Sequence, residues 1–248
     1  GRWDFRAIYD ASDRIILISH ALERQFAERV PEDKLTVSRN GIDYDSVAFA
    51  FDGLEKDTLR LLVTGRLVPD KNQEEAIRAL AYIRENSLTD KNVVLHIAGS
   101  SPRRTHVGGY AKRLKSLVEA LDLQDAVIFE GEVADMRELR RHMDIELMCA
   151  VRETFGRVTV EAMRSGLMVI GSDTGGTPEI IQDGVTGCLY RQGDYRDLAE
   201  TIVRAVSDID RYNEIRQNAI AYASTHFTVE QNCAEIYRVL ADCARKTE

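Results

Sequence analysis

The stretch IELMCAVRETFGRVTVEAMRSGLMVIGS, residues 145–172, contains two short apolar runs separated by a turn and a helix-like segment. The runs 145–150 and 167–172 are almost continuously apolar, which is typical of strands that are buried on both faces of a sheet. The segment 157–165 lies between them and has a helical pattern. A strand, a helix and a second strand in this order predict a parallel β-α-β unit.

The same alternation continues on both sides of this unit. In the segment 73–86, apolar residues recur at helical spacing. Further strand-like runs are 14–19, 59–65, 92–99, 126–131 and 187–190. Further helix-like segments are 110–121, 136–142 and 195–207, with two or three helices over 209–246. The pattern predicts an α/β fold with a doubly wound, mostly parallel, Rossmann-like sheet, helices on both faces and C-terminal helices.

The first part of the chain does not follow this rhythm. Its strand 14–19 is followed by one helix (21–28), a short strand near 36–38 and a polar stretch, 43–57. We therefore predict that residues 1–55 are the tail of another domain and that residues 56–228 form the Rossmann-like domain.

Composition excludes some classes of function. The net charge of −8 argues against a general nucleic-acid-binding protein, because phosphate backbones require a basic face. The four cysteines form no CxxC pair and no histidine cluster has metal-ligand spacing, so we expect reduced thiols and no metal site. No apolar run approaches the roughly 20 residues of a membrane span, and no signal peptide is visible. These features predict a cytoplasmic protein.

Ligands of open parallel sheets bind beyond the C-terminal ends of the strands, so the loops at those ends are the candidate sites. After the run 59–65, Gly65 and Arg66 are followed closely by Lys71. A glycine here permits a tight backbone turn. The two cations either face an anion or are solvated surface charges, and this loop alone does not decide between them.

The run 92–99 ends in Gly99 and Ser100, a pair that suits close approach of the backbone to a ligand. The next cations, Arg103 and Arg104, are expected to be exposed to solvent. His96 lies within the buried-strand pattern, where a satisfied core histidine is a more natural interpretation than a catalytic one.

The segment 153–161 combines a helix start with two carboxylates. The predicted helix begins close to Gly156, and the free N–H groups and positive dipole of its first turn favour an anion. Glu153 precedes the helix and Glu161 lies inside it, so the two would flank a ligand at the helix start and accept from different sugar hydroxyls. The alternative for Glu161 is a solvated helix position, which its apolar neighbours Val160 and Ala162 make less natural.

A second glycine-rich turn follows the run 167–172. Gly175 and Gly176 precede Thr177 and Pro178, which suit the cap and the first position of a helix. The turn is either part of the binding site or an ordinary capped helix start.

These loops, taken in order, resemble the family 4 glycosyltransferases, which are retaining enzymes with the GT-B fold of two Rossmann-like domains. The resemblance rests on GRLVPDK (65–71), ETFGRVTVE (153–161) and GGTPE (175–179), with RNGID (39–43) similar to the family's interdomain segment. It implies that this chain carries the C-terminal domain, which holds the nucleotide diphosphate sugar, and a remnant of the N-terminal domain, which holds the acceptor. It further implies that residues 229–248 form a closing helix that crosses back to the N-terminal domain. The family often has Gly-x-Gly where this chain has Gly99-Ser100-Ser101, so this loop departs from the family pattern.

The resemblance also implies roles for single residues. Arg66 and Lys71 would bind the donor diphosphate, Glu161 the ribose hydroxyls and Glu153 the transferred sugar. The loop near Glu132 and Val133 would flank the base. The full set of donor-binding positions is Gly65, Gly99, Ser100, Val133, Thr154, Phe155, Gly156, Arg157, Val158, Glu161, Gly175 and Gly176.

The function implied is transfer of a hexose from a nucleotide diphosphate sugar, with retention, to a saccharide or lipid-linked acceptor, without a metal or other cofactor. We expect this chain alone to be inactive without the N-terminal domain, to self-associate through 14–19, and to be membrane-peripheral in the full-length protein. Alternatives are a nucleotide-sugar-binding module, a sugar-nucleotide epimerase or a pyridoxal-dependent phosphorylase. A dehydrogenase is disfavoured, since no GxGxxG opens a β-α-β unit.

Overall fold

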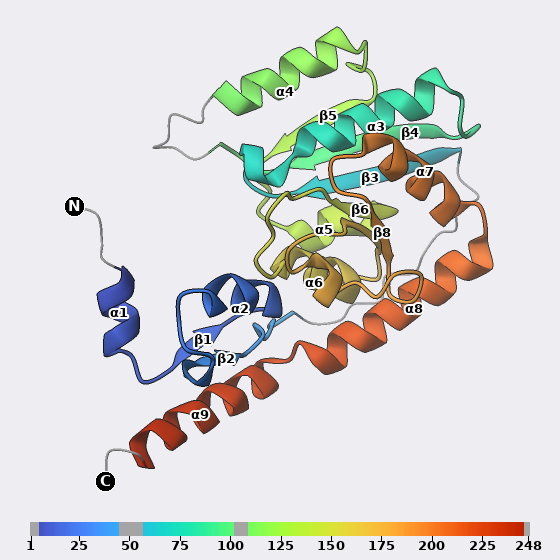
Figure 1. Cartoon of the computed structure of the whole chain (residues 1–248). Coiled ribbons are helices and arrows are strands. Elements are labelled where there is room, and N and C mark those ends of the chain that lie inside the picture. Colours follow the sequence, from blue (N-terminus) through green and yellow to red (C-terminus); the bar gives the residue numbers. More distant parts are fainter. Residues whose placement is uncertain (1–4, 45–56, 102–108, 246–248) are drawn as a thin grey trace.

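The computed structural model describes residues 5–44, 57–101 and 109–245, and Figure 1 shows their arrangement. Six parallel strands form the central sheet in the order β5-β4-β3-β6-β7-β8. The expected doubly wound sheet is confirmed. Its strands are β3 (Thr58–Thr64), β4 (Asn92–Ala98), β5 (Val127–Gly131), β6 (Ile145–Met148), β7 (Met168–Ser172) and β8 (Cys188–Tyr190).

The strand order places the chain's reversal of direction in the middle of the sheet. From β3 the chain builds outward through β4 to β5, then returns to β6 on the other side of β3 and continues to β8. In the shared register Leu61 lies beside Ile145, and Leu62 beside Glu146. The crevice beyond the C-terminal ends of β3 and β6 is therefore the topological switch point, where open α/β sheets bind their ligands.

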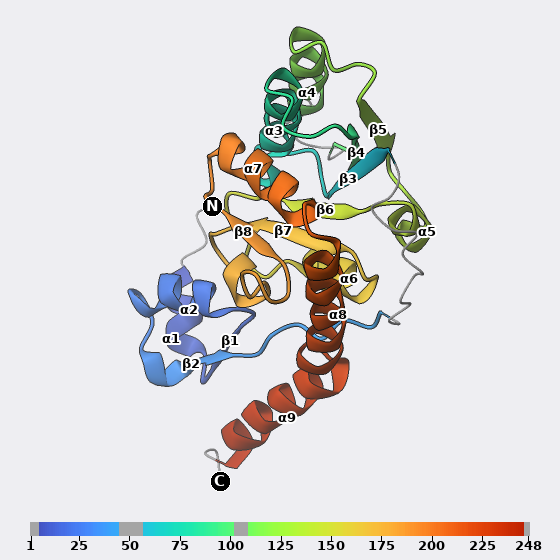
Figure 2. The ribbon, with the colours of Figure 1, turned by 90° about the vertical axis from the view of Figure 1, so that its right-hand side faces the viewer.

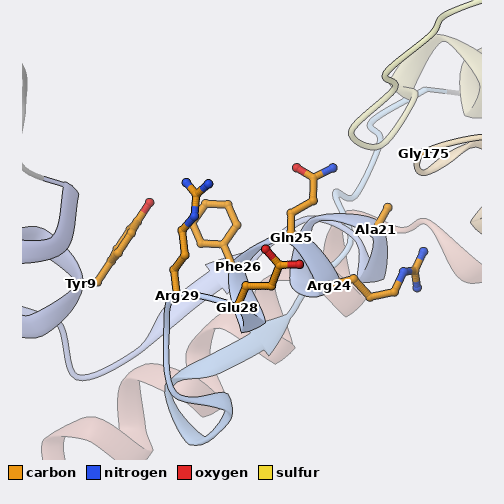
Figure 3. Close-up of a pocket in the computed structure, with 8 residues that line it drawn as sticks. All are labelled: Tyr9, Ala21, Arg24, Gln25, Phe26, Glu28, Arg29 and Gly175. Atoms are coloured by element: carbon orange, nitrogen blue, oxygen red, sulfur yellow. The ribbon is translucent and has the colours of Figure 1, made fainter.

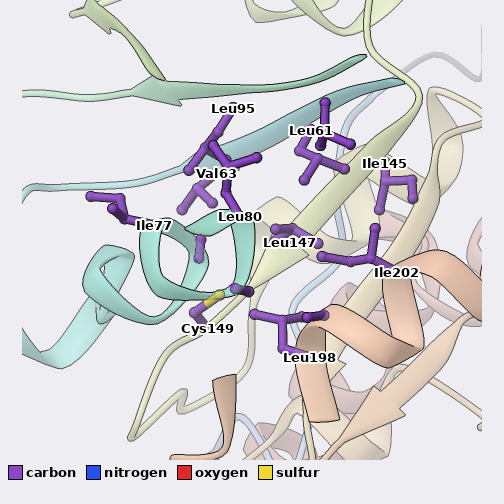
Figure 4. Packing of buried hydrophobic residues seen from close by; sticks show 14 of the residues in the cluster. Leu61, Val63, Ile77, Leu80, Leu95, Ile145, Leu147, Cys149, Leu198 and Ile202 are labelled. Atoms are coloured by element: carbon purple, nitrogen blue, oxygen red, sulfur yellow. The ribbon is translucent and has the colours of Figure 1, made fainter. Parts of the chain in front are cut away.

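Helices cover both faces of the sheet, because successive strand side chains point to opposite faces. Leu61 and Val63 pack into one core cluster, and Leu62 packs into the other. Figure 4 shows the first cluster, where Leu80 and Leu198 meet the strands. This face is covered by α3 (Gln73–Glu85), α4 (Gly109–Ala120) and α7 (Tyr195–Val206), and Figure 2 shows α5 (Met136–Arg141), α6 (Arg157–Arg164) and α8 (Ile209–His226) on the other side.

The N-terminal segment forms a small separate layer below the sheet (Figure 1). Within it β1 (Ile15–Leu17) pairs in parallel with β2 (Leu35–Val37), and α2 (His20–Ala27) connects the two strands. The last helix, α9 (Val229–Arg245), runs along this layer. Asn232 Nδ2 donates to Ser38 Oγ at 2.9 Å and to the carbonyl oxygen of Arg39 at 2.8 Å. The start of α9 is thereby tied to the segment after β2, and the predicted domain limits stay predictions.

The sequence did not predict the first helix or the short 3-10 turns. The helix α1 spans Phe5–Ala11, and the 3-10 turns are η1 (Glu32–Lys34), η2 (Pro69–Lys71) and η4 (Thr177–Glu179). Thr177 was expected to cap a helix, but it lies inside η4 and no side chain caps this turn. A turn this short has few N–H groups that need a cap, so its stability comes from packing, with Thr177 only 1% exposed.

Candidate functional site

The loops that follow β3 and β4 are joined along their backbones at the C-terminal edge of the sheet. Gly65 N donates to Ala98 O at 2.9 Å, and Leu67 N donates to Ser100 O at 3.0 Å. A Cβ atom on Gly99 would lie 1.9 Å from the carbonyl oxygen of Gly65, so this position accepts only glycine. The tertiary structure therefore brings three predicted site positions together. Arg103 and Arg104 lie outside the described residues.

A cation and a carboxylate meet across the switch point. Lys71 ends the turn η2 after β3, and its Nζ lies 2.5 Å from Glu153 Oε2 in the loop after β6. The two side chains are 29% and 15% exposed, so both can be reached from solvent. Val151 N donates to Asp70 O at 2.9 Å, which ties the two loops together. Two predicted residues that are 82 positions apart in the chain thus form one charged centre.

The helix α6 begins directly after this pair. Gly156 precedes it in the left-handed conformation, with φ of 92°, and no side chain caps the helix. The first N–H groups of a helix have no partner within it, so those of Arg157 and Val158 lie at the positive end of the helix dipole. A negatively charged group near Lys71 would therefore be attracted by the lysine and by the helix end together.

The glycine turn after β7 supports the loop that carries Glu153. Gly176 N donates to the carbonyl oxygen of Glu153 at 2.7 Å. Gly175 has φ of +61°, and a Cβ atom there would lie 2.4 Å from the same oxygen. Any larger residue at 175 would push this loop away from the turn. The two glycines thus fix the backbone of Glu153 by close approach.

The second predicted carboxylate, Glu161, meets a buried cation that the sequence did not indicate. Arg140 Nη1 lies 3.3 Å from Glu161 Oε2, and Arg140 Nε donates to Glu146 Oε2 at 2.8 Å. Arg140 and Glu146 are completely buried, whereas the Glu161 side chain is 23% exposed. Burial alone would lower the pKa of Arg140, but the adjacent Glu146 carboxylate raises it above the ordinary arginine value. Arg140 therefore stays charged at every physiological pH.

The glutamate of the second glycine-rich turn contacts the N-terminal layer. Glu179 accepts hydrogen bonds from the backbone N–H groups of His20 (2.9 Å) and Ala21 (2.6 Å) at the start of α2. Arg39 Nη2 lies 3.6 Å from the same carboxylate. No local pattern of residues predicts this role of Glu179, because its partners come from a distant part of the chain.

Other predicted positions lie around this centre without joining the ion pairs. Arg66 is exposed, and its guanidinium makes no hydrogen bond or ion pair with another described residue. Val133 is partly buried and packs against the core cluster of α6 and α8. Phe155 is buried, with its ring 5.8 Å from that of Phe227. Its side chain is therefore part of the core, which leaves only its backbone for a ligand.

His96, expected to be a satisfied core histidine, is only partly buried but has a carboxylate partner. Its Nδ1 lies 2.6 Å from Glu130 Oε1, and its side chain is 12% exposed. Within the described ranges, no group of three or more His, Cys, Asp or Glu side chains is arranged to hold a metal ion. The helices of the same ranges include none with the length and apolar character needed to cross a membrane. All four cysteines are free thiols.

A cavity of about 510 Å³ lies between the N-terminal layer and the turn after β7 (Figure 3). Among the predicted site residues only Gly175 lines it. Its other lining residues come from α1, α2 and the residues directly after α2, namely Tyr9, Ala21, Arg24, Gln25, Phe26, Glu28 and Arg29. The cavity therefore adjoins the charged centre but does not include Lys71 or Glu153.

Comparison with known proteins identifies the family. The model of the family described as glycosyl transferases group 1 matches residues 48–222, which is more than half of the chain. The chain belongs to this family. The match includes the loops with Lys71, Glu153, Glu161 and Gly175, so the charged centre of this group 1 glycosyl transferase lies within the shared region.

Curated relatives and solved structures are similar to this group 1 glycosyl transferase over most of its length. It is 26% identical over 245 residues to N-acetyl-alpha-D-glucosaminyl L-malate synthase of Bacillus anthracis, covering 95% of this chain and 61% of the relative. A crystal structure of Anabaena HepE in complex with UDP and glucose is 27% identical, with a TM-score of 0.80, covering 93% of this chain and 63% of that one. Sucrose-phosphate synthase from Thermosynechococcus elongatus, at 22% identity and a TM-score of 0.83, shows the same fold over 98% of this chain and 61% of its own. The chain thus spans about three fifths of the length of these proteins.

Proposed function

We propose that this group 1 glycosyl transferase binds a nucleotide diphosphate sugar at the switch point between β3 and β6 and that the complete protein transfers the sugar to an acceptor. The observation that carries this proposal is the meeting of Lys71 and Glu153 beside the uncapped start of α6. One centre thus offers a cation and helix N–H groups for an anion, and a carboxylate for sugar hydroxyls.

When the donor binds, its diphosphate would replace Glu153 as the partner of Lys71. The contact of Lys71 with Glu153 is itself a charge-assisted hydrogen bond, so the exchange gains from the larger negative charge of the diphosphate and from the N–H groups at the start of α6. It releases the Glu153 carboxylate to accept from the sugar. Arg66 is exposed in the same loop and can turn its planar fork toward the diphosphate.

Transfer breaks the bond between the anomeric carbon and the diphosphate oxygen, and negative charge develops on the leaving group. On this proposal Lys71, Arg66 and the N–H groups at the start of α6 stabilise that charge, and no metal ion is needed. We assign Glu153 to positioning the sugar and Glu161 to the ribose hydroxyls, and we expect retention of the anomeric configuration. Val133 and the loop around it would flank the base.

A UDP-sugar is the first donor to test, because the HepE structure contains UDP and glucose. Thermal-shift measurements with UDP-, GDP-, ADP- and dTDP-sugars would identify the base. A ligand at 100 times its dissociation constant adds about 2.7 kcal/mol to the stability of the fold. We expect the nucleotide sugar with one of these bases to stabilise the chain clearly more than the free sugar does. If none of the four donors shifts the melting temperature, the proposed donor site is wrong.

The acceptor concerns the complete protein and not this chain alone. We propose a saccharide or lipid-linked acceptor, bound mainly by sequence that the longer relatives have in addition, and a cytoplasmic, membrane-peripheral location for the whole protein. On this proposal the 248-residue chain binds donor but does not transfer sugar. Robust transfer by the chain alone would contradict it. Donor binding without transfer by the complete protein would favour a binding module.

Self-association is a separate proposal. Ile16 in β1 is 36% exposed, and among the described residues β1 pairs only with β2, in a two-stranded sheet. An unpaired strand edge is a template for pairing with a second chain. We expect light scattering to show a dimer that an Ile16→Lys substitution dissociates. A monomer at all concentrations would contradict the proposal.

A further inference from the structure

Arg140 and Glu146 form a completely buried ion pair behind the proposed ribose site. The guanidinium of Arg140, near the end of α5, makes two contacts with the carboxylate of Glu146 in β6, at 2.8 and 3.3 Å. Removing two charges from water is expensive, and such a pair is often no more stabilising than apolar residues of similar size. Stability alone therefore does not explain why a buried ion pair joins α5 to the central sheet.

The remaining contacts of Arg140 point toward the site. Its Nη1 donates to Glu161 Oε2 at 3.3 Å and to the hydroxyl of Tyr44 at 3.5 Å. Tyr44 Oη also lies 2.6 Å from Ser165 Oγ, at the end of α6. The guanidinium thus links three elements, namely β6, α6 and the segment after β2. Of the carboxylates it contacts, only Glu161 reaches the surface.

Glu161 is held on one side only. Its Oε2 contacts Arg140, while its Oε1 has no hydrogen-bond partner among the described residues. A carboxylate can accept at both oxygens, so the arginine leaves capacity for hydroxyl donors. Without a partner, a glutamate side chain samples several rotamers, and each one it must abandon lowers affinity.

We infer that Arg140, anchored by Glu146, is a positioning residue that fixes the Glu161 carboxylate for the two hydroxyls of the donor ribose. This inference rests on the proposed function. It makes the buried ion pair a device for recognising a ribonucleotide: Glu146 holds Arg140, Arg140 holds Glu161, and Glu161 accepts from the ribose. Tyr44 adds its ring, 5.8 Å from the guanidinium carbon, as a further wall of the arginine pocket.

If Arg140 has a purely structural role, its removal should not change the preference for ribose hydroxyls. Binding measurements can therefore distinguish the structural role from the positioning role. The probes are UDP and 2′,3′-dideoxy-UDP, titrated calorimetrically into the whole chain. Wild-type protein is expected to bind UDP at least tenfold more tightly than the dideoxy compound. Glu161→Gln should remove most of that ratio by weakening UDP alone.

The decisive variant is Arg140→Met/Glu146→Leu, which removes the buried pair without leaving an unpaired charge. It should weaken UDP at least threefold and leave the dideoxy compound unchanged. In the Glu161→Gln background the same double change should have no further effect on the ratio. Arg140→Lys, which keeps the charge but loses the fork, should give an intermediate ratio and serves if the double variant does not fold.

Arg216→Met is the matched control. Arg216 is also a buried arginine, and its Nε donates to the carbonyl oxygen of Gly166 after α6. This variant is expected to lower stability without changing the ratio. An unchanged ratio in folded Arg140 variants overturns the positioning role and leaves the proposed function intact. Failure of the wild-type chain to bind any nucleoside diphosphate overturns the proposed function, and the role of Arg140 with it.

Discussion

Two glutamates on either side of the start of α6 each meet a cation, and the two pairs differ in burial. The pair of Glu153 with Lys71 is partly exposed and joins two loops. The contact of Glu161 with Arg140 continues into the core, where Arg140 and Glu146 are inaccessible. The exposed pair can change partners at little cost, because water and ligand compete for both charges. The buried cation cannot, since its separation would leave a charge without a partner. We interpret the first pair as the one that changes partners when the donor binds. The second is the rigid support that orients the donor.

The strongest test of this difference is to break the buried pair on one side. Arg140→Ala leaves Glu146 unpaired at zero exposure, so we expect a loss of about 3–5 kcal/mol in the free energy of unfolding. Urea denaturation of the purified chain measures it. Glu146→Ala should cost a similar amount. A loss below about 1 kcal/mol in both variants would mean that water reaches the pair and that the two ion pairs do not differ in solvent access.

The support of the exposed pair is tested at Gly175. Gly175→Ala places a Cβ atom against the carbonyl oxygen of Glu153 at a positive φ, and strain of this kind costs about 1–3 kcal/mol. The loop must shift, so donor affinity should fall together with stability. Gly193→Ala is a control for the backbone conformation alone, because its φ is +84° but a Cβ atom there meets no other atom within 4 Å. Equal donor affinity in the two variants would remove Gly175 from the site.

The exposed pair itself should matter for binding and little for folding. Lys71→Ala removes a cation from the diphosphate, so we expect donor affinity to fall tenfold or more, which corresponds to about 1.4 kcal/mol. Calorimetry with the best donor of the thermal-shift panel provides the measurement. Lys112→Ala, on the surface of α4, is a matched control. Unchanged affinity in both Lys71→Ala and Glu161→Ala would refute the assignment of the site.

The smallest effect is expected for the stability contribution of the ion pair. Glu153→Gln keeps the shape of the side chain but removes the charge that Lys71 contacts. The free energy of unfolding should change by less than about 1 kcal/mol, as for other partly exposed pairs, and added salt should reduce the difference further. A change as large as that of Arg140→Ala would show that both pairs are structural.

Much of the sheet could be predicted from sequence because its strands are apolar and its helices amphipathic. The eight strands of the described residues lie within or beside predicted runs, and Leu61 and Leu80, which lie in the predicted segments 59–65 and 73–86, are in the core. Residues typical of turns and helix caps predicted the local structure less reliably. Thr177 and Pro178 suggested a helix, yet the chain makes one 3-10 turn there, because packing below the turn decides its length.

The candidate site was only partly visible. Glu153, Glu161 and Lys71 could be proposed from their places at strand ends and from the family resemblance. The partner of Glu161 could not, since Arg140 stands in a short basic helix, MRELRR, that resembles any solvated surface helix. Arg140 is buried because it pairs with Glu146 in β6. The apolar pattern of that strand gave no reason to expect a partner for Glu146.

The sequence by itself determined the alternation of strands and helices, the glycines at the strand ends and the charged residues near them, because these depend on neighbours within a few positions. Only the tertiary structure decided that β3 lies beside β6. That adjacency brings Lys71 to Glu153 across 82 positions and sets Arg140 between Glu146 and Glu161. Pairings of this kind depend on strand order, which is fixed by how the whole apolar core packs and not by any local pattern of residues.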